Sequence, residues 1–219
     1  MPRLLFSKEG EAVWISHLDL MRLFQRAFKR AGLNLTHTQG YNPRPSVSIA
    51  LPLSVGVESV CELLDFDLTG DSVSCDEITG KLNEALVAGV KVIACYDNGR
   101  KIRDLALLRC VITLEYDNGY PEGTADAVRM LFRNESLTVP KKGKNGIVDQ
   151  DIIPMIRWLN VSEKGEKELK IEALVCCQNP SLNPMQLVAA IERYCPELKP
   201  DHAVCCRKEI YDTNETIFR

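Results

Sequence analysis

Apolar residues recur along the N-terminal part of the chain with the spacing of a helix buried on one face. From Leu20 to Ala31 they return every three or four residues. Ser16 and Asp19 precede this run with the spacing of an N-cap and its first turn, and Gly32 follows it. These signals predict a helix from Ser16 to Ala31. The residues expected on its buried face are Leu20, Phe24, Ala27 and Phe28.

Short extended segments surround this helix. We expect strands at 3–6 with 12–15, 33–37, 47–51, 60–68 and 90–96, and a second helix at 76–88. Gly10 lies inside the first of these segments and indicates a turn or bulge within a strand. The resulting order, β-α-β-β-α-β, is the split βαβ order of ferredoxin-like folds.

A similar order of elements follows the polar segment 97–106. There we expect strands at 107–116, 136–139, 169–177 and 203–211, helices at 124–132 and 183–194, and a polar loop, KKGKNG, after residue 140. The pattern of 148–159 does not decide between helix and strand. We therefore predict an α+β protein of two ferredoxin-like (split βαβ) halves with antiparallel sheets. The predicted boundaries are 1–98 and 105–212, with a tail at 213–219.

Composition indicates a globular protein without a membrane segment. Apolar residues make up 45% of the 219 residues, which is ordinary for a chain that buries a core. No apolar run reaches the roughly 18 residues of a membrane-spanning helix. The N-terminus lacks the apolar centre of a signal peptide. We expect a soluble cytoplasmic protein that does not bind membranes.

Nine cysteines raise the question of metals and disulfides. No two of them have the C-x-x-C spacing with which a tight turn closes two thiolates on one metal. The adjacent pairs 176–177 and 205–206 would point to opposite faces of a strand. We expect free thiols that act as small core residues, with no metal and no cofactor.

Positive charge is concentrated in one part of the chain. The formal net charge is −3, yet residues 15–57 contain five basic side chains and one acid, Asp19. Arg22, Arg26 and Arg30 lie four residues apart, so they share one helix face. Such a row is most often a solvated outer face. Its functional interpretation is a surface for the phosphates of RNA or a nucleotide.

The segment after this helix strengthens the functional interpretation. Gly40 to Pro45 places a ring, an amide and a guanidinium in one turn, groups that suit an unpaired base and its phosphate. The alternative is a rigid turn with Tyr41 buried. The candidate anion-binding residues are Arg22, Arg26, Arg30, His37, Tyr41, Asn42 and Arg44.

His17 is a weak candidate for catalysis. A general acid or base needs a partner within hydrogen-bond reach, and Asp19, two residues on, faces another side of the helix. A capping or packing role is therefore favoured. Phosphate-loop, dinucleotide, serine-hydrolase and zinc-protease motifs are absent from the sequence. We favour a chain that is not an enzyme on its own.

Several motifs in succession resemble a known family. ISHLDLMR at 15–22, GYNPRP at 40–45 and LPLSVGVES at 51–59 resemble the radical-SAM-associated family DUF2344, a domain of unknown function. Looser similarity follows at 146–156, 178–186 and 207–211, so the resemblance covers nearly the whole chain. Asp151 and Asn183 stand where the motifs of the family have arginine.

The resemblance implies a partner more than a reaction. Such proteins occur beside or fused to cobalamin-binding-type radical SAM proteins, and their genes often lie near those for a ribonuclease of the E/G type and a ribosomal protein. We therefore predict an accessory or substrate-presenting partner of a radical SAM enzyme that binds RNA or another anion through residues 16–45. One alternative is a metal-independent, ribonuclease-like enzyme that uses His17. Another is a structural adaptor whose charged helix docks on a protein.

Overall fold

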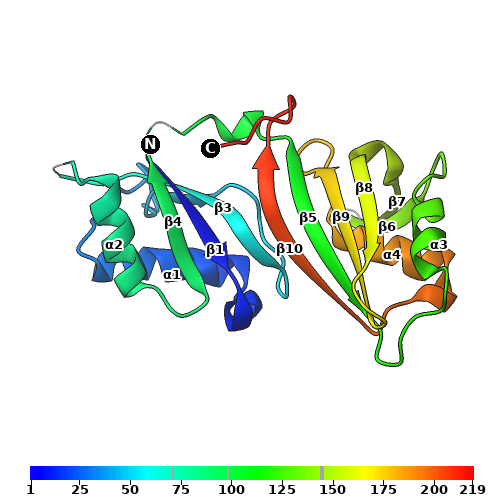
Figure 1. The fold of residues 1–219 in the computed structure, drawn as a ribbon. Coiled ribbons are helices and arrows are strands. Elements are labelled where there is room, and N and C mark those ends of the chain that lie inside the picture. Colours follow the sequence, from blue (N-terminus) through cyan, green and yellow to red (C-terminus); the bar gives the residue numbers. More distant parts are fainter. Residues whose placement is uncertain (71, 98, 144–145) are drawn as a thin grey trace. The chain divides into compact units, whose positions relative to one another are not determined.

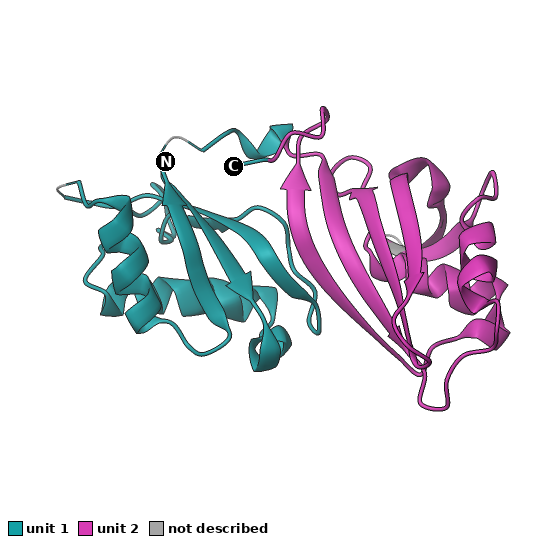
Figure 2. Cartoon of the chain, viewed as in Figure 1, with its two compact units in different colours: residues 1–104, 218–219 teal, residues 105–217 magenta. Residues whose placement is uncertain are grey.

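The computed structural model describes residues 1–70, 72–97, 99–143 and 146–219. They form two compact units (Figure 2). Unit 1 contains residues 1–104 and 218–219, and unit 2 contains residues 105–217. Both units mix helices with antiparallel strands, so the α+β class predicted from the sequence is confirmed. Within the described ranges, no helix is long and apolar enough to cross a membrane.

Unit 1 packs two helices against a small sheet (Figure 1). Its strands are β1 (Arg3–Lys8), β2 (Val47–Ile49), β3 (Glu58–Phe66) and β4 (Val90–Tyr96), and its helices are α1 (His17–Arg30) and α2 (Cys75–Ala85). β1 lies between β4 and β3. Leu64 and Asp65 of β3 pair with both β1 and β2, so β2 lies on the other edge of β3.

The buried face of α1 is the one that the apolar spacing predicts. Leu20, Phe24, Ala27 and Phe28 are all fully buried. The Phe24 ring lies 4.7 Å from that of Phe6 on β1, and the Phe28 ring 5.0 Å from that of Phe66 on β3. Ser16 caps the helix, because its hydroxyl accepts a hydrogen bond from the Asp19 amide. The opposite, basic face of α1 is thereby turned outward.

The expected strand at 12–15 is wrong. A 3₁₀ helix, Gly10–Trp14, follows β1 instead. The fully buried side chain of Lys8 explains the difference, because its ammonium donates to the carbonyls of Val13 at 3.0 Å and Ile15 at 2.8 Å. These bonds satisfy the buried charge only if the chain curls around it.

The expected strand at 33–37 is also wrong. Only isolated bridges occur there, between Leu35 and Leu68 and between His37 and Pro45. Residues 38–44 form a narrow loop, which the Thr38 amide closes by donating to the Arg44 carbonyl at 2.8 Å. Pro45 has no N–H to offer, so a ladder cannot develop around this bridge.

Unit 2 has a four-stranded sheet, two helices and a separate hairpin. The sheet strands are β5 (Leu107–Glu115), β8 (Ile156–Glu163), β9 (Glu168–Cys176) and β10 (His202–Tyr211), and the helices are α3 (Thr124–Leu131) and α4 (Met185–Tyr194). The sheet order is β10-β5-β9-β8. The hairpin consists of β6 (Thr138–Gly143) and β7 (Gly146–Asp151).

The hairpin corrects the expected polar loop. β6 continues to Gly143 and β7 starts at Gly146, so part of KKGKNG is strand, and residues 144–145 lie outside the described residues. Pairing between the two strands, for example Lys141 with Val148, imposes the extended form on a polar sequence. The undecided segment 148–159 contains the end of β7, a 3₁₀ helix at Ile153–Met155 and the start of β8.

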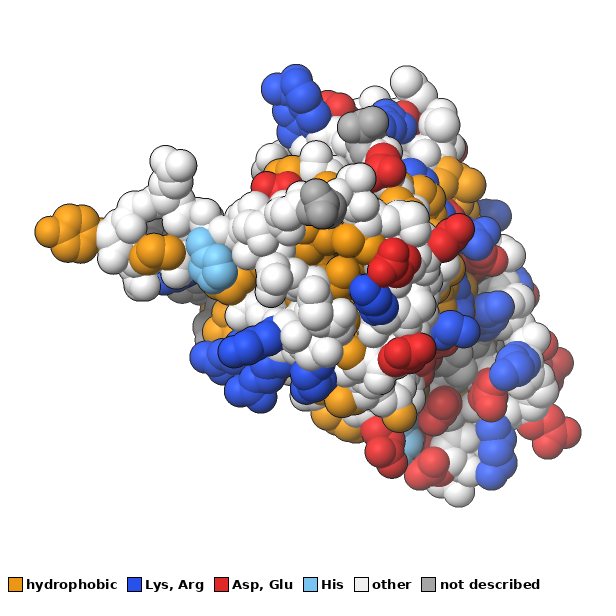
Figure 3. Space-filling model, turned by 90° about the vertical axis from the view of Figure 1, so that its left-hand side faces the viewer, with side chains coloured by type: hydrophobic (Ala, Val, Ile, Leu, Met, Phe, Trp, Pro, Cys, Tyr) orange, Lys and Arg blue, Asp and Glu red, His pale blue; other side chains and the backbone are white. Residues whose placement is uncertain are grey.

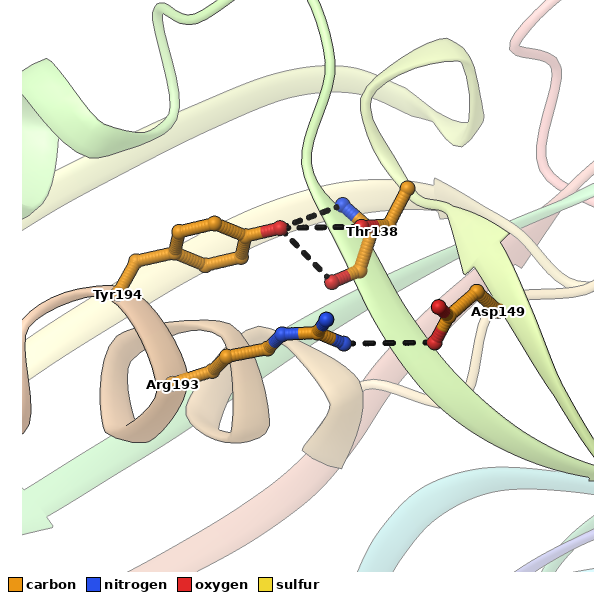
Figure 4. A network of polar contacts seen from close by, with 4 residues as sticks. All are labelled: Thr138, Asp149, Arg193 and Tyr194. Atoms are coloured by element: carbon orange, nitrogen blue, oxygen red, sulfur yellow. Dashed lines mark hydrogen bonds and ion pairs between the residues drawn. The ribbon is translucent and has the colours of Figure 1, made fainter.

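Polar contacts attach this hairpin to α4 (Figure 4). The Thr138 amide donates to the Tyr194 hydroxyl at 3.2 Å, and this hydroxyl donates to the Thr138 carbonyl at 3.0 Å. Arg193 pairs with Asp149 of β7 at 3.3 Å. Neighbouring residues at the end of α4 therefore hold both hairpin strands.

The final residues of the expected tail return to unit 1. Phe218 is fully buried, and the guanidinium groups of Arg3 and Arg100 lie 5.5 and 5.0 Å from its ring centroid. Arg3 is itself fixed by two hydrogen bonds to the Asp65 carboxylate. A cation–π arrangement of this kind adds to the burial of the ring.

Candidate nucleic-acid interface

The basic row of α1 lines a shallow cavity on unit 1. Arg22, Arg26 and Arg30 line a volume of about 420 Å³. The other lining residues are Ile15, Asp19, Leu23 and Val87. We call this the arginine hollow. Because α1 rises about 1.5 Å per residue, the three arginines follow one another at about 6 Å along its surface. Their expected common face is thus confirmed.

The three arginines differ in how they are held. Arg22 donates to the Asp19 carboxylate at 2.9 Å. Arg30 donates to the carbonyl of Ala85, the last residue of α2, at 2.5 Å. The Arg26 side chain is exposed and makes no hydrogen bond or ion pair within the described part of the chain. The middle guanidinium is therefore available to a ligand between two anchored neighbours.

Asp19 moderates this charge without cancelling it. The Ser16 hydroxyl donates to its carboxylate at 2.7 Å and, with Arg22, lowers the pKa of Asp19 below its ordinary value. The carboxylate therefore stays ionised and occupies Arg22. Arg26 adds to the lowering of this pKa through its charge, but neither Arg26 nor Arg30 forms an ion pair with an acid among the described residues.

His37 lies at a second cavity, on the neighbouring face of α1. Gln25 and Lys29 of the helix line this volume of about 360 Å³, opposite His37 and Pro45 at the base of the 38–44 loop. We call it the His37 hollow. The structure thus brings His37 to Lys29, whereas the sequence had grouped it with the arginines.

Tyr41, Asn42 and Arg44 lie outside both hollows. All three are exposed, and the Tyr41 side chain is as open as in an extended peptide, at 111% relative exposure. The alternative in which Tyr41 is buried is therefore wrong. Their side chains make no hydrogen bond or ion pair with other described residues. Figure 3 shows basic side chains gathered on one face of unit 1, beside a projecting loop.

His17 has no partner for proton transfer. Its Nδ1 is buried without a hydrogen-bond partner among the described residues. Asp19, the nearest acid in sequence, is engaged by Ser16 and Arg22. A catalytic histidine is normally oriented by a hydrogen bond to one ring nitrogen, and the described residues supply none to Nδ1 of His17.

The cysteines lie apart from these hollows as free thiols. The neighbouring Cys205 thiol and burial raise the pKa of Cys110 in unit 2, which keeps Cys110 protonated at neutral pH. No cluster of three or more histidine, cysteine or acidic side chains suited to a metal occurs within the described ranges.

The two departures from the family motifs have structural roles. The Asp151 carboxylate accepts hydrogen bonds from the amides of Leu137 at 3.0 Å and Ile153 at 3.1 Å. Asn183 accepts one from the Met185 amide at 3.1 Å, at the start of α4. These positions organise backbone here, and neither belongs to the hollows of unit 1.

Sequence reasoning missed a third cavity, in unit 2. Arginines and aromatic residues from α3 and β8 line a volume of about 300 Å³. Its residues are distant in sequence and carry no motif, so only the packing of α3 beside β8 reveals them.

A comparison with family models gives one match. The model described as "Uncharacterized protein conserved in bacteria (DUF2344)" matches residues 2–184. A search of curated proteins found no match.

Solved structures show similarity of fold at low sequence identity. One chain of the crystal structure of a Cbf5-Nop10-Gar1 complex is 9% identical with a TM-score of 0.51, covering 95% of this chain and 48% of that one. This chain thus spans about half the length of that relative. An unknown protein from Galdieria sulphuraria is 13% identical with a TM-score of 0.27, covering 94% and 96%. The first similarity concerns the fold alone, and the second is too weak to support a conclusion.

Proposed function

The chain belongs to the DUF2344 family of uncharacterized bacterial proteins, so its function has to be inferred from its own surface. We propose that unit 1 binds RNA and presents it to a catalytic partner. The observation that carries the proposal is the unpartnered guanidinium of Arg26 between two anchored arginines in the arginine hollow. An arginine that serves only stability is normally paired or packed, whereas Arg26 is exposed and unpaired among the described residues.

The arrangement favours a repeating anion. Three guanidinium groups along one helix face meet successive phosphates better than one small anion, which a single bidentate arginine would hold. Phosphate contacts give affinity and register, and they do not read the bases. The arginine hollow therefore supplies affinity without sequence preference.

The His37 hollow and the 38–44 loop would add contacts to bases. Lys29 and His37 extend the positive surface around α1. Tyr41 holds a fully exposed ring at the tip of the loop, and such rings stack on unpaired bases with about 1–3 kcal/mol per base. Arg44, in the same loop, would bind a phosphate in bidentate fashion.

The partner in this proposal is a radical SAM enzyme of the cobalamin-binding type. The motifs at 15–22 and 40–45 support it, because they are among the segments that resemble the radical-SAM-associated family, and they contribute Arg22, Tyr41 and Arg44 to the proposed RNA surface. A presenting role also agrees with the lack of a hydrogen-bond partner for His17 Nδ1.

We further interpret each unit as a ferredoxin-like half. The sheet order β4-β1-β3-β2 of unit 1 and the order β10-β5-β9-β8 of unit 2 support this interpretation. In both, a helix follows the first and the third strand of the sheet in chain order. The hairpin β6–β7 is then an insertion in the second half.

RNA binding by an Arg26→Ala variant tests the proposal. We expect at least about a tenfold weaker affinity, since a hydrogen bond to a charged group contributes about 1.5–3 kcal/mol. The slope of log affinity against log salt should fall by about 1. Arg103→Ala is the matched control, because Arg103 is 76% exposed and lies outside the hollows. Equal binding by the wild type and both variants would refute the proposed surface.

The partner is tested by pull-down from native lysate with identification of protein and RNA. Recovery of a radical SAM protein by the wild type, and its loss with Arg26→Ala, would support presentation of RNA to that enzyme. Bound RNA that shortens on incubation with the purified chain would favour the ribonuclease-like alternative. Recovery of neither would leave the adaptor hypothesis.

A further inference from the structure

The cavity of unit 2, which we call the unit 2 hollow, combines guanidinium groups with an aromatic ring. It encloses about 300 Å³. Arg129, Phe132 and Arg133 line it from α3 and the two residues after it, and Arg157, Trp158 and Asn160 line it from β8. This volume is at the lower end of the range for small-ligand sites, about 300–1,000 Å³.

A β-bulge brings neighbouring residues of β8 to this hollow. In a regular strand, consecutive side chains point to opposite faces. The register between β8 and β9 shifts between Ile156 and Trp158, so Arg157 is the additional residue. Bulges re-aim side chains in this way. Arg157 and Trp158 therefore both line the hollow. The strand that carries them, β8, is the last in the strand order of the sheet.

Of the three arginines that line the hollow, only one has its side chain held by contacts with other described residues. Arg129 is fixed, because its guanidinium donates twice to the Val161 carbonyl, at 2.7 and 3.2 Å, and pairs with Asp126. The side chains of Arg133 and Arg157 are exposed and make no hydrogen bond or ion pair with any residue that the structure describes. No acidic side chain among the described residues lines the hollow.

We propose that the unit 2 hollow binds one nucleotide of a single-stranded RNA. Trp158 is 38% exposed and lines the hollow, and its indole would stack on a base. Arg133 and Arg157 would hold the phosphates on either side, and Asn160 presents an amide that can hydrogen-bond to a base edge. A neutral peptide would not explain why two unpaired arginine side chains line the same hollow as an aromatic ring. This site lies in a different unit from the arginine hollow and extends RNA binding beyond it.

Tryptophan fluorescence tests this site directly. The chain has two tryptophans, and Trp14 is 71% exposed in unit 1, so Trp14→Phe leaves Trp158 as the only reporter at little cost in stability. Titration of this variant with a short oligouridylate should quench Trp158 saturably. Adding Arg133→Ala or Arg157→Ala should raise the concentration for half-quenching by about tenfold or more. Adding Arg103→Ala should leave that concentration unchanged.

The outcomes separate this site from the surface of unit 1. Quenching that persists in an Arg26→Ala variant would support the unit 2 hollow even if the arginine hollow failed. Absence of quenching, in a protein whose RNA binding still depends on Arg26, would overturn the inference and leave the proposed function intact. Uridine monophosphate that quenches at the same concentration as the oligonucleotide would overturn the assignment to an RNA strand and identify a free nucleotide as the ligand.

Discussion

Individual side chains in unit 1 decide how α1 presents its basic face. Phe24 and Phe28 are fully buried and pack on rings from β1 and β3. Arg22, Arg26 and Arg30 lie on the solvent side because those rings fix the rotation of the helix. The buried face and the functional face are therefore consequences of the same spacing.

Replacing Phe24 by alanine tests this arrangement. Phe24→Ala should lower the free energy of unfolding by about 3–5 kcal/mol, because it leaves a cavity in the core. Leu18→Ala, at a position 66% exposed on the same helix, should change it by less than about 0.5 kcal/mol. Urea denaturation measures both variants. Similar stability of the two would show that α1 does not face the core through Phe24.

Asp151 makes the stability of unit 2 depend on pH. Hydrogen bonds from the Leu137 and Ile153 amides lower the pKa of Asp151 below the ordinary value of 3.8. A lowered pKa in the folded state stabilises the protein above the unfolded-state pKa, and this contribution is lost as the pH falls through the folded-state pKa.

We therefore expect Asp151→Asn to be less stable than the wild type at neutral pH. The asparagine oxygen still accepts hydrogen bonds but carries no charge. The difference should shrink as the pH falls below about 4, where the aspartate becomes protonated in the unfolded chain. Denaturation midpoints measured from neutral to acidic pH would show this. A difference that stayed constant over the whole range would contradict the role of the charge.

Whole elements are attached to one another by a few polar contacts at their ends. Arg30 ties the end of α1 to the last carbonyl of α2, whereas Arg26 ties α1 to no described residue. We expect Arg30→Ala to cost about 0.5–1.5 kcal/mol of stability and Arg26→Ala less than about 0.5 kcal/mol. Thermal melting of the two variants distinguishes them. A stability loss in Arg26→Ala would remove its use as a clean probe of binding.

The hairpin β6–β7 depends in the same way on α4. Tyr194→Phe removes the hydroxyl that contacts Thr138 (Figure 4), which should cost about 0.5–1.5 kcal/mol. Amide exchange should accelerate in β6, starting at Thr138. Tyr211→Phe is a matched control, because the Tyr211 hydroxyl makes no hydrogen bond within the described ranges. Unchanged exchange in β6 would show that Arg193 and Asp149 suffice.

At the scale of the whole molecule, the chain joins its two units twice. It leaves unit 1 after residue 104 and returns to it with residues 218–219. The return is anchored by Phe218, which is fully buried beneath Arg3 and Arg100. Each unit also contains one tryptophan, Trp14 or Trp158, so single-tryptophan variants report the unfolding of each unit separately.

Phe218→Ala should destabilise unit 1 by about 3–5 kcal/mol, because it empties a fully buried position. The Trp14 signal, in a Trp158→Phe background, should show the loss as a lower urea midpoint. Ile217→Ala, at the preceding position, which is 50% exposed, should have little effect. Equal midpoints for the two variants would mean that the returning residues contribute nothing to unit 1.

The sequence by itself determined the features that depend on local spacing. Helical periodicity and the Ser16 cap located α1, its buried face and the common face of its arginines. Alternation and turn residues located most other strands and helices, for example Val90–Tyr96, to within a few residues. These predictions succeed because the determining contacts lie within a few residues of one another.

Only the tertiary structure decided the features that depend on residues distant in sequence. The buried ammonium of Lys8 curls residues 10–15, pairing with β7 extends β6 through a polar sequence, and the β-bulge at Arg157 aims β8 at the unit 2 hollow. The same holds for the grouping of candidate residues, since His37 lines a cavity with Lys29 and not with the arginine row. Neither periodicity nor charge counts encode which surfaces come together, because the packing of separate elements sets the distances between their side chains.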